Sequence, residues 1–88
     1  MGKLSSSENN DEFQREIEKH MLGLLFERYS QDTALTNSEE MRISLKKYSE
    51  SNLYDMALNN LIIQNLISRI GIDEYRITES GIDEYENM

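Results

Sequence analysis

The sequence has no cysteine and only one histidine, His20, among its 88 residues. Without cysteine the chain forms no disulfide bond and has no thiolate for catalysis. A single histidine without cysteine cannot supply the nitrogen and sulfur ligands of a zinc site. These absences exclude a disulfide-stabilised scaffold, a thiol enzyme and a zinc centre, and they are compatible with a reducing compartment.

Long apolar runs and catalytic motifs are also missing. No stretch approaches the ~18 apolar residues of a membrane-spanning helix, and no signal peptide opens the chain. The sequence contains no nucleophile elbow, phosphate-binding loop or dinucleotide fingerprint. Its adjacent acid pairs lack the alternating ligand pattern of a calcium loop. We therefore expect a cytoplasmic protein that is not an enzyme, binds no cofactor or metal and does not enter a membrane.

Basic residues are scarce relative to acidic ones. The chain has 9 Lys and Arg against 17 Asp and Glu, a net charge of −8 at pH 7. This balance disfavours DNA, because affinity for phosphate backbones comes largely from Lys and Arg. The length suits one small domain. Residues 1–10 are polar and rich in Ser and Asn, so we expect a disordered arm there and a folded domain over residues 11–88.

The first predicted helix covers residues 11–30. Its apolar residues step by four, four and three positions, which places them on one face. The first half, where Glu18 is expected to face solvent, is longer than one small domain needs. It should either fold back on the body or meet a second copy of the chain. The apolar residues on this face are Phe13, Ile17, Met21 and Leu24.

Two further helices are expected. Residues 36–39, Thr-Asn-Ser-Glu, fit a capping box in which the Thr36 hydroxyl accepts the amide of the fourth residue. This predicts a second helix up to about Tyr48. A third helix is expected over residues 53–64. Asn65 then stands where a residue in the left-handed conformation ends many helices.

A β hairpin follows the third helix. Residues 66–70, in which Leu66, Ile67 and Ile70 are apolar, predict a strand. Residues 71–74 supply a turn, and residues 75–78 predict the returning strand.

The sequence Gly-Ile-Asp-Glu-Tyr occurs twice, beginning at Gly71 and at Gly81. A structural repeat needs a unit that can stack on its copies, and five residues are too few. The first copy falls in the predicted turn. The second lies near a last helical turn over residues 82–85, which Thr78 or Ser80 would cap. We interpret the duplication as coincidence.

This order of elements resembles the winged helix-turn-helix transcription regulators of bacteria and archaea. The resemblance implies a mainly α fold with a small antiparallel β wing, that is, a three-helix body plus a two-stranded wing. It also implies that the third helix enters the major groove of DNA while the wing follows the backbone. The resemblance covers roughly residues 21–85 and is carried by Leu58, Leu61, Leu66, Ile67 and the run Tyr75-Arg76-Ile77-Thr78-Glu79-Ser80-Gly81.

The resemblance also implies which residues contact DNA. The groove-facing positions would be Asn52, Leu53, Asp55, Met56 and Asn59. The third helix departs from the family pattern, because it has no Lys or Arg to hold phosphates or guanine. The predicted wing tip is acidic. Basic residues elsewhere could contact phosphates if the second helix lies beside the wing. Alternatively, these residues are solvated and form salt bridges. They are Arg42, Lys46, Lys47, Arg69 and Arg76.

A second apolar stripe runs along the third helix, with Asn60 in its middle. Large exposed apolar patches are unusual on monomers. Either the first helix covers the stripe within one chain, or the stripe packs against a second subunit or a partner helix, where Asn60 would set the register. We expect a homodimer with these interface residues: Phe13, Ile17, Leu53, Met56, Ile63 and Ile67.

Two functions remain in competition. The fold resemblance favours a small DNA-binding transcriptional regulator. The net charge and the second stripe favour an acidic protein-interaction module on the same fold. Such a module would dimerise or bind a protein partner through Leu53, Met56, Ile63 and Ile67, without touching DNA.

Overall fold

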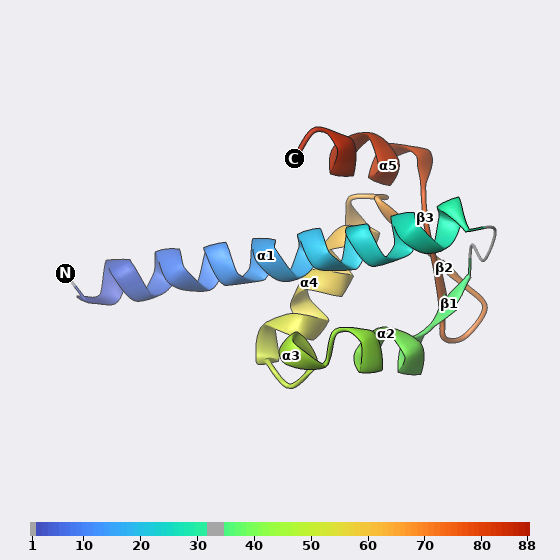
Figure 1. Ribbon diagram of the computed structural model, residues 1–88. Helices are drawn as coiled ribbons and strands as arrows, with labels where there is room; N and C mark the ends of the chain where they lie inside the picture. Colours follow the sequence, from blue (N-terminus) through green and yellow to red (C-terminus); the bar gives the residue numbers. More distant parts are fainter. Residues whose placement is uncertain (1, 32–34) are drawn as a thin grey trace.

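A long helix crosses the molecule, and the other elements gather around its C-terminal half (Figure 1). The structure, a computed structural model, describes residues 2–31 and 35–88. It is mainly helical with a small three-stranded antiparallel sheet. The elements are α1 (Gly2–Ser30), β1 (Thr36–Asn37), α2 (Ser38–Ser44), α3 (Lys46–Ser49), α4 (Asn52–Ile63), β2 (Ile67–Ile70), β3 (Glu74–Ile77) and α5 (Glu79–Glu86).

The helix α1 begins at Gly2, where the composition predicts a disordered arm over residues 1–10. Residue 1 lies outside the described residues. The chain has no proline, and no glycine lies between Gly2 and Gly23, so nothing in this segment stops helical hydrogen bonding. The N-terminal turns of α1 extend past the rest of the molecule (Figure 1).

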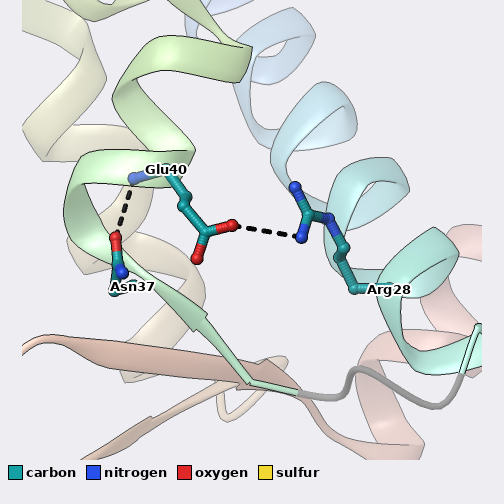
Figure 2. A network of polar contacts seen from close by, with 3 residues as sticks. All are labelled: Arg28, Asn37 and Glu40. Carbon is teal, nitrogen blue, oxygen red and sulfur yellow. Dashed lines mark hydrogen bonds and ion pairs between the residues drawn. The ribbon is translucent and has the colours of Figure 1, made fainter.

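The start of α2 differs from the predicted capping box by one position. The cap is Asn37, whose Oδ1 accepts a hydrogen bond from the amide of Glu40 at 2.8 Å. Thr36 belongs to β1 and is fully buried, so its side chain is not placed to cap the helix. Figure 2 shows how the Glu40 carboxylate also reaches Arg28 near the end of α1, at 3.2 Å. The contact joins the end of α1 to the start of α2.

The predicted second helix is divided at Leu45 into α2 and α3. Met41, Leu45 and Tyr48, which lie before, at and after this break, are all buried. The next helix, α4, is capped by Ser51, whose Oγ accepts the amide of Leu53 at 3.1 Å.

The end of α4 confirms the prediction for Asn65, which has φ 63°. The amide of Leu66 donates to the carbonyl of Leu61 at 2.9 Å, and the Asn65 amide donates to Ile62 at 3.0 Å. This pair of bonds is the Schellman motif. It reverses the chain so that Leu66 and Ile67 turn inward, where both are buried.

The predicted hairpin is present as β2 and β3, and β1 adds a third strand that the sequence did not predict. The strand order is β1-β3-β2, with all pairs antiparallel. Two residues are too few for the alternating pattern that reveals a strand. Alternate residues of the hairpin face the body, and Ile67, Tyr75 and Ile77 are buried there.

The last helix, α5, is fixed to the end of α4 by Thr78. Its Oγ1 accepts the amide of Gly81 at 2.9 Å and donates to the carbonyl of Asn65 at 2.7 Å. Gly81 is buried, and a Cβ there would collide with the carbonyl oxygen of Leu66 and lie 2.7 Å from Cγ1 of Ile77. Only glycine allows this approach.

The core lies between α1, α4 and the sheet. Of the two α4 leucines that contribute to the family resemblance, Leu61 is 1% exposed and Leu58 is half-buried. No helix among residues 2–31 and 35–88 is both long and apolar enough to cross a membrane. The buried apolar residues are Ile17, Met21, Leu22, Leu25, Met41, Leu45, Tyr48, Tyr54, Ala57, Leu61, Leu66, Ile67, Tyr75 and Ile77.

Candidate functional site

The side of α4 turned away from the core is exposed along its length. At about 100° per residue, five residues of α4 share this side. Met56 is 56% exposed and Ile63 is 73% exposed, which is high for apolar residues. Leu53, also expected in the DNA groove, instead packs partly against the core. We call the following set the outer face of α4: Asn52, Asp55, Met56, Asn59 and Ile63.

The hairpin borders the outer face of α4. A groove of about 440 Å³ lies between them, with Arg69 of β2 and Tyr75 of β3 on its hairpin side. Its lining is mostly apolar. The helix α4 contributes Asp55, Met56, Leu58, Asn59 and Ile62.

Arg42 of α2 neutralises the one acidic residue of the outer face. Its Nη2 lies 3.1 Å from Oδ1 of Asp55, and its guanidinium carbon lies 5.0 Å from the ring centroid of Tyr54. Both Arg42 and Asp55 are exposed, so the ion pair contributes little to stability. It does cancel a charge that would repel phosphates.

Tyr54 of α4 is buried beneath the guanidinium group of Arg42. Its hydroxyl is buried and has no hydrogen-bond partner among the described residues. Burial raises the pKa of Tyr54, and Asp55 and Tyr75 add to the rise while Arg42 opposes it. The phenol therefore stays neutral and acts as a packing group under Arg42.

The five predicted basic residues do not form one cluster. Arg69 pairs with Tyr75 and Arg76 pairs with Ser68, so the two arginines project from opposite faces of the sheet. Arg76 instead lines a pocket with Tyr29, on the side away from the groove. The convergence expected from the sequence is wrong for this residue, because strand register decides the face.

Of the other basic residues, Arg69 borders the groove beside the outer face, and Lys46 and Lys47 lie on the short helix α3. Arg69 donates from Nε to the carbonyl of Ile72 at 2.9 Å, which holds it at the hairpin turn. Lys46 and Lys47 are exposed on α3, and the Lys47 ammonium lies 5.5 Å from the ring centroid of Tyr48.

Charge is unevenly distributed along the chain. Residues 41–76, from α2 to β3, contain five basic and four acidic side chains. The remaining residues contain four basic and thirteen acidic side chains. Segment 41–76 therefore carries a net charge of +1 and the remaining residues carry −9, mostly in α1, at the start of α2 and in α5.

The predicted interface stripe is split by the fold. Ile17 and Ile67 are 0% and 1% exposed inside the single chain, so they are core residues and not an interface. Ile67 turns inward because α4 ends at Ile63 and the chain reverses. Asn60 faces α1 and donates to Glu18 at 2.9 Å. Phe13, Met56 and Ile63 remain exposed.

An aromatic contact that the sequence did not reveal joins α3 to α1. The Tyr48 hydroxyl donates to the Glu16 carboxylate at 2.7 Å, and the rings of Phe13 and His20 lie 5.8 and 5.0 Å from the Tyr48 ring. The hydrogen bond to Glu16, together with burial, raises the pKa of Tyr48. These residues brace α3 against α1, and so help to position the start of α4.

Comparison of the chain with protein-family models, with curated proteins and with solved structures gives no match. Within residues 2–31 and 35–88, no three His, Asp or Glu side chains gather as a metal site. The candidate site is the exposed outer face of α4 with the groove beside it.

Proposed function

We propose that the chain is a winged-helix protein that binds DNA through the outer face of α4 and acts as a small transcriptional regulator. The observation that supports this proposal best is the outer face itself. It is exposed along its length and is bordered by a hairpin, in a mainly helical fold with a small antiparallel sheet. In the family that the sequence resembles, this helix enters the major groove.

The residues of the outer face suit base contacts better than phosphate contacts. Asn52 and Asn59 are exposed amides, and an amide pairs with the N6 and N7 edge of adenine. Met56 offers an apolar contact for a thymine methyl group. Phosphate contacts fall to the basic residues around the face, namely Arg42, Lys46, Lys47 and Arg69. Arg76, which projects from the other side of the sheet, is not among them.

The uneven charge shapes the expected binding. The near-neutral segment 41–76 meets DNA, while the acidic segments of α1 and α5 repel it. Non-specific binding should therefore be weak, and specificity should rest on the few base contacts.

Anisotropy of labelled mixed-sequence duplex DNA, measured over a salt series, tests this proposal. Binding should be detectable at low salt and fall steeply as salt rises. Arg69→Ala should reduce the salt slope by about 1. Arg76→Ala is the matched control, because it removes the same charge from the opposite face of the same hairpin. No binding at low salt, or equal effects of the two substitutions, would contradict the proposal.

A second candidate function is protein binding through the same face. It is favoured by the exposed apolar side chains of Met56 and Ile63 and by the apolar lining of the adjacent groove. An amphipathic helix of a second copy or of another protein would lie in this groove. Met56→Lys and Ile63→Lys should leave folding intact, since both side chains are exposed. Loss of a dimer in light scattering would support self-association, and a monomer at high concentration would contradict it.

A further inference from the structure

Glu18 of α1 is a buried carboxylate without a cationic partner. It is 9% exposed, although it stands among residues expected to face solvent. Its Oε2 accepts hydrogen bonds from Nε2 of Gln14 at 3.1 Å and from Nδ2 of Asn60 at 2.9 Å. No ion pair joins Glu18 to a basic side chain within the described part of the chain. Buried charges in proteins are normally paired, so this carboxylate is unusual.

Glu18 opens into a cleft of about 630 Å³ between α1, α4 and the C-terminal region. That volume lies within the range of small-molecule sites. The cleft is polar. Besides Glu18, its wall includes Arg15 and Lys19 from α1, Asn60 and Gln64 from α4, and Glu84 from α5.

The acceptors around Glu18 match an ammonium group. Since Asn60 donates from Nδ2, its Oδ1 remains available, and it accepts no hydrogen bond from the described residues. The same holds for Oε1 of Glu18. With the side-chain oxygen of Gln64 on the same cleft, three acceptors can receive the three N–H donors of a primary ammonium.

We propose that the cleft binds a small molecule through a primary ammonium group, which pairs with Glu18 and with the side-chain oxygens of Asn60 and Gln64. Two kinds of compound with this group also suit the other charged residues of the cleft wall. In a free amino acid, the carboxylate would pair with Arg15 or Lys19. In a diamine, the second ammonium would pair with Glu84. The proposal is independent of DNA binding, because Asn60 and Asn59 project from different sides of α4.

Titration of the ¹⁵N-labelled full chain with L-lysine and with cadaverine tests the proposal. The two probes differ only by a carboxylate. At least one should shift the side-chain amide signals of Gln14 and Asn60 in a saturable way, against a sodium chloride titration of equal ionic strength. The absence of a saturable shift with both probes would overturn the proposal.

The variant Glu18→Gln removes the charge but keeps an oxygen to accept from Gln14 and Asn60. It should weaken binding at least about tenfold, since charge-assisted hydrogen bonds are roughly twice as strong as neutral ones. Glu27→Gln is the matched control on the exposed side of α1 and should bind as the native chain does. Equal weakening in both variants would overturn the proposal. If Glu18→Gln does not fold, 1-pentanol replaces cadaverine as the uncharged probe, and a shift as large as that of cadaverine would overturn it.

Two further variants identify the source of the ammonium group. The double variant Arg15→Ala with Lys19→Ala should weaken L-lysine and spare cadaverine if the ligand is an amino acid. Glu84→Gln should weaken cadaverine if it is a diamine, and it should weaken L-lysine as well, because L-lysine carries the same second ammonium group. Either result supports the proposal and selects the class of ligand.

Discussion

The same five residues, Gly-Ile-Asp-Glu-Tyr, occupy positions 71–75 and 81–85 and adopt two different structures. The first copy forms the hairpin turn and the start of β3, at the edge of the molecule. The second copy lies within α5, which follows the end of β3. Because the local sequence is identical, the difference must come from what surrounds each copy.

The two glycines are needed for different reasons. Gly71 has φ +70° and no neighbouring atom that a Cβ would approach, so its role is conformational. Gly81 is helical, and its role is spatial, because the carbonyl of Leu66 occupies the place of a Cβ.

The apolar residues of the two copies also have different environments. Ile72 is 84% exposed at the hairpin tip, whereas Ile82 packs against the core. Tyr75 is buried in β3. Tyr85 instead contacts the ring of Phe26, at 5.3 Å between centroids, beside Gly23 of α1.

Of the substitutions that test this difference between the two copies, Gly81→Ala should lower the stability of the protein most. The added methyl meets a backbone oxygen that cannot rotate away, so the free energy of unfolding should fall by about 3 kcal/mol or more. Urea denaturation followed by circular dichroism measures the loss. Ser80→Ala, an exposed change in the same helix, is the control and should lie within about 0.5 kcal/mol of the native chain. A Gly81→Ala variant of native stability would show that Gly81 does not pack closely against the carbonyl group of Leu66.

Substitution of the isoleucine in each copy should give the next largest difference in stability. Ile82→Ala should cost about 1–2 kcal/mol of unfolding free energy, less than a fully buried residue because Ile82 is only half-buried. Ile72→Ala, the same change in the other copy, should alter it by less than about 0.5 kcal/mol. The same urea experiment measures both, and equal losses would refute the assignment of Ile82 to the core.

Gly71→Ala should lower the free energy of unfolding less than Gly81→Ala or Ile82→Ala does. Forcing an L residue into the left-handed conformation costs about 1 kcal/mol. Gly71→Asn should recover most of that loss, because Asn tolerates this conformation. Thermal unfolding resolves the two variants, since about 1 kcal/mol shifts Tm by roughly 4–8 °C in a domain of this size. An Asn variant no better than Ala would contradict the conformational role.

The smallest signal is expected from isolated peptides. Synthetic peptides of residues 68–78 and 78–88 should both give the circular dichroism of an unfolded chain, because short helices and lone hairpins are marginal in water. Stable helix in the second peptide would mean that Thr78 and its neighbours specify α5 locally, without the body of the protein.

Local signals predicted the features that depend on a few neighbouring residues. Asn65 ends α4 in the left-handed conformation, as expected, because the Schellman motif involves only the last turn and the next two residues. The cap of α2 is displaced by one residue, since both Thr36 and Asn37 are capable of capping. The choice falls to Asn37 because Thr36 is buried in β1, where it pairs with Tyr75.

The candidate sites depended more on distant contacts. Four of the residues expected on the DNA side of α4 share its outer face, because helical spacing alone assigns them there. The basic cluster could not be predicted in the same way, since the pairing of Arg69 and Arg76 across β2 and β3 sets their faces. The sequence could not identify Glu18 as a site residue, because its hydrogen-bond donor Asn60 lies 42 positions away in the chain.

By itself, the sequence determined the bounds of α4 and of the two hairpin strands to within one residue, and it determined which residue ends α4. Those properties follow from the 3.6-residue and two-residue periods of the backbone and from residues such as Asn65 and Gly71. Only the tertiary structure decided that one Gly-Ile-Asp-Glu-Tyr segment becomes a turn and strand and the other a helix, and that Glu18 is buried against Asn60. The physical reason is that packing brings together groups far apart in the chain, and their contacts outweigh the weak preferences of five residues.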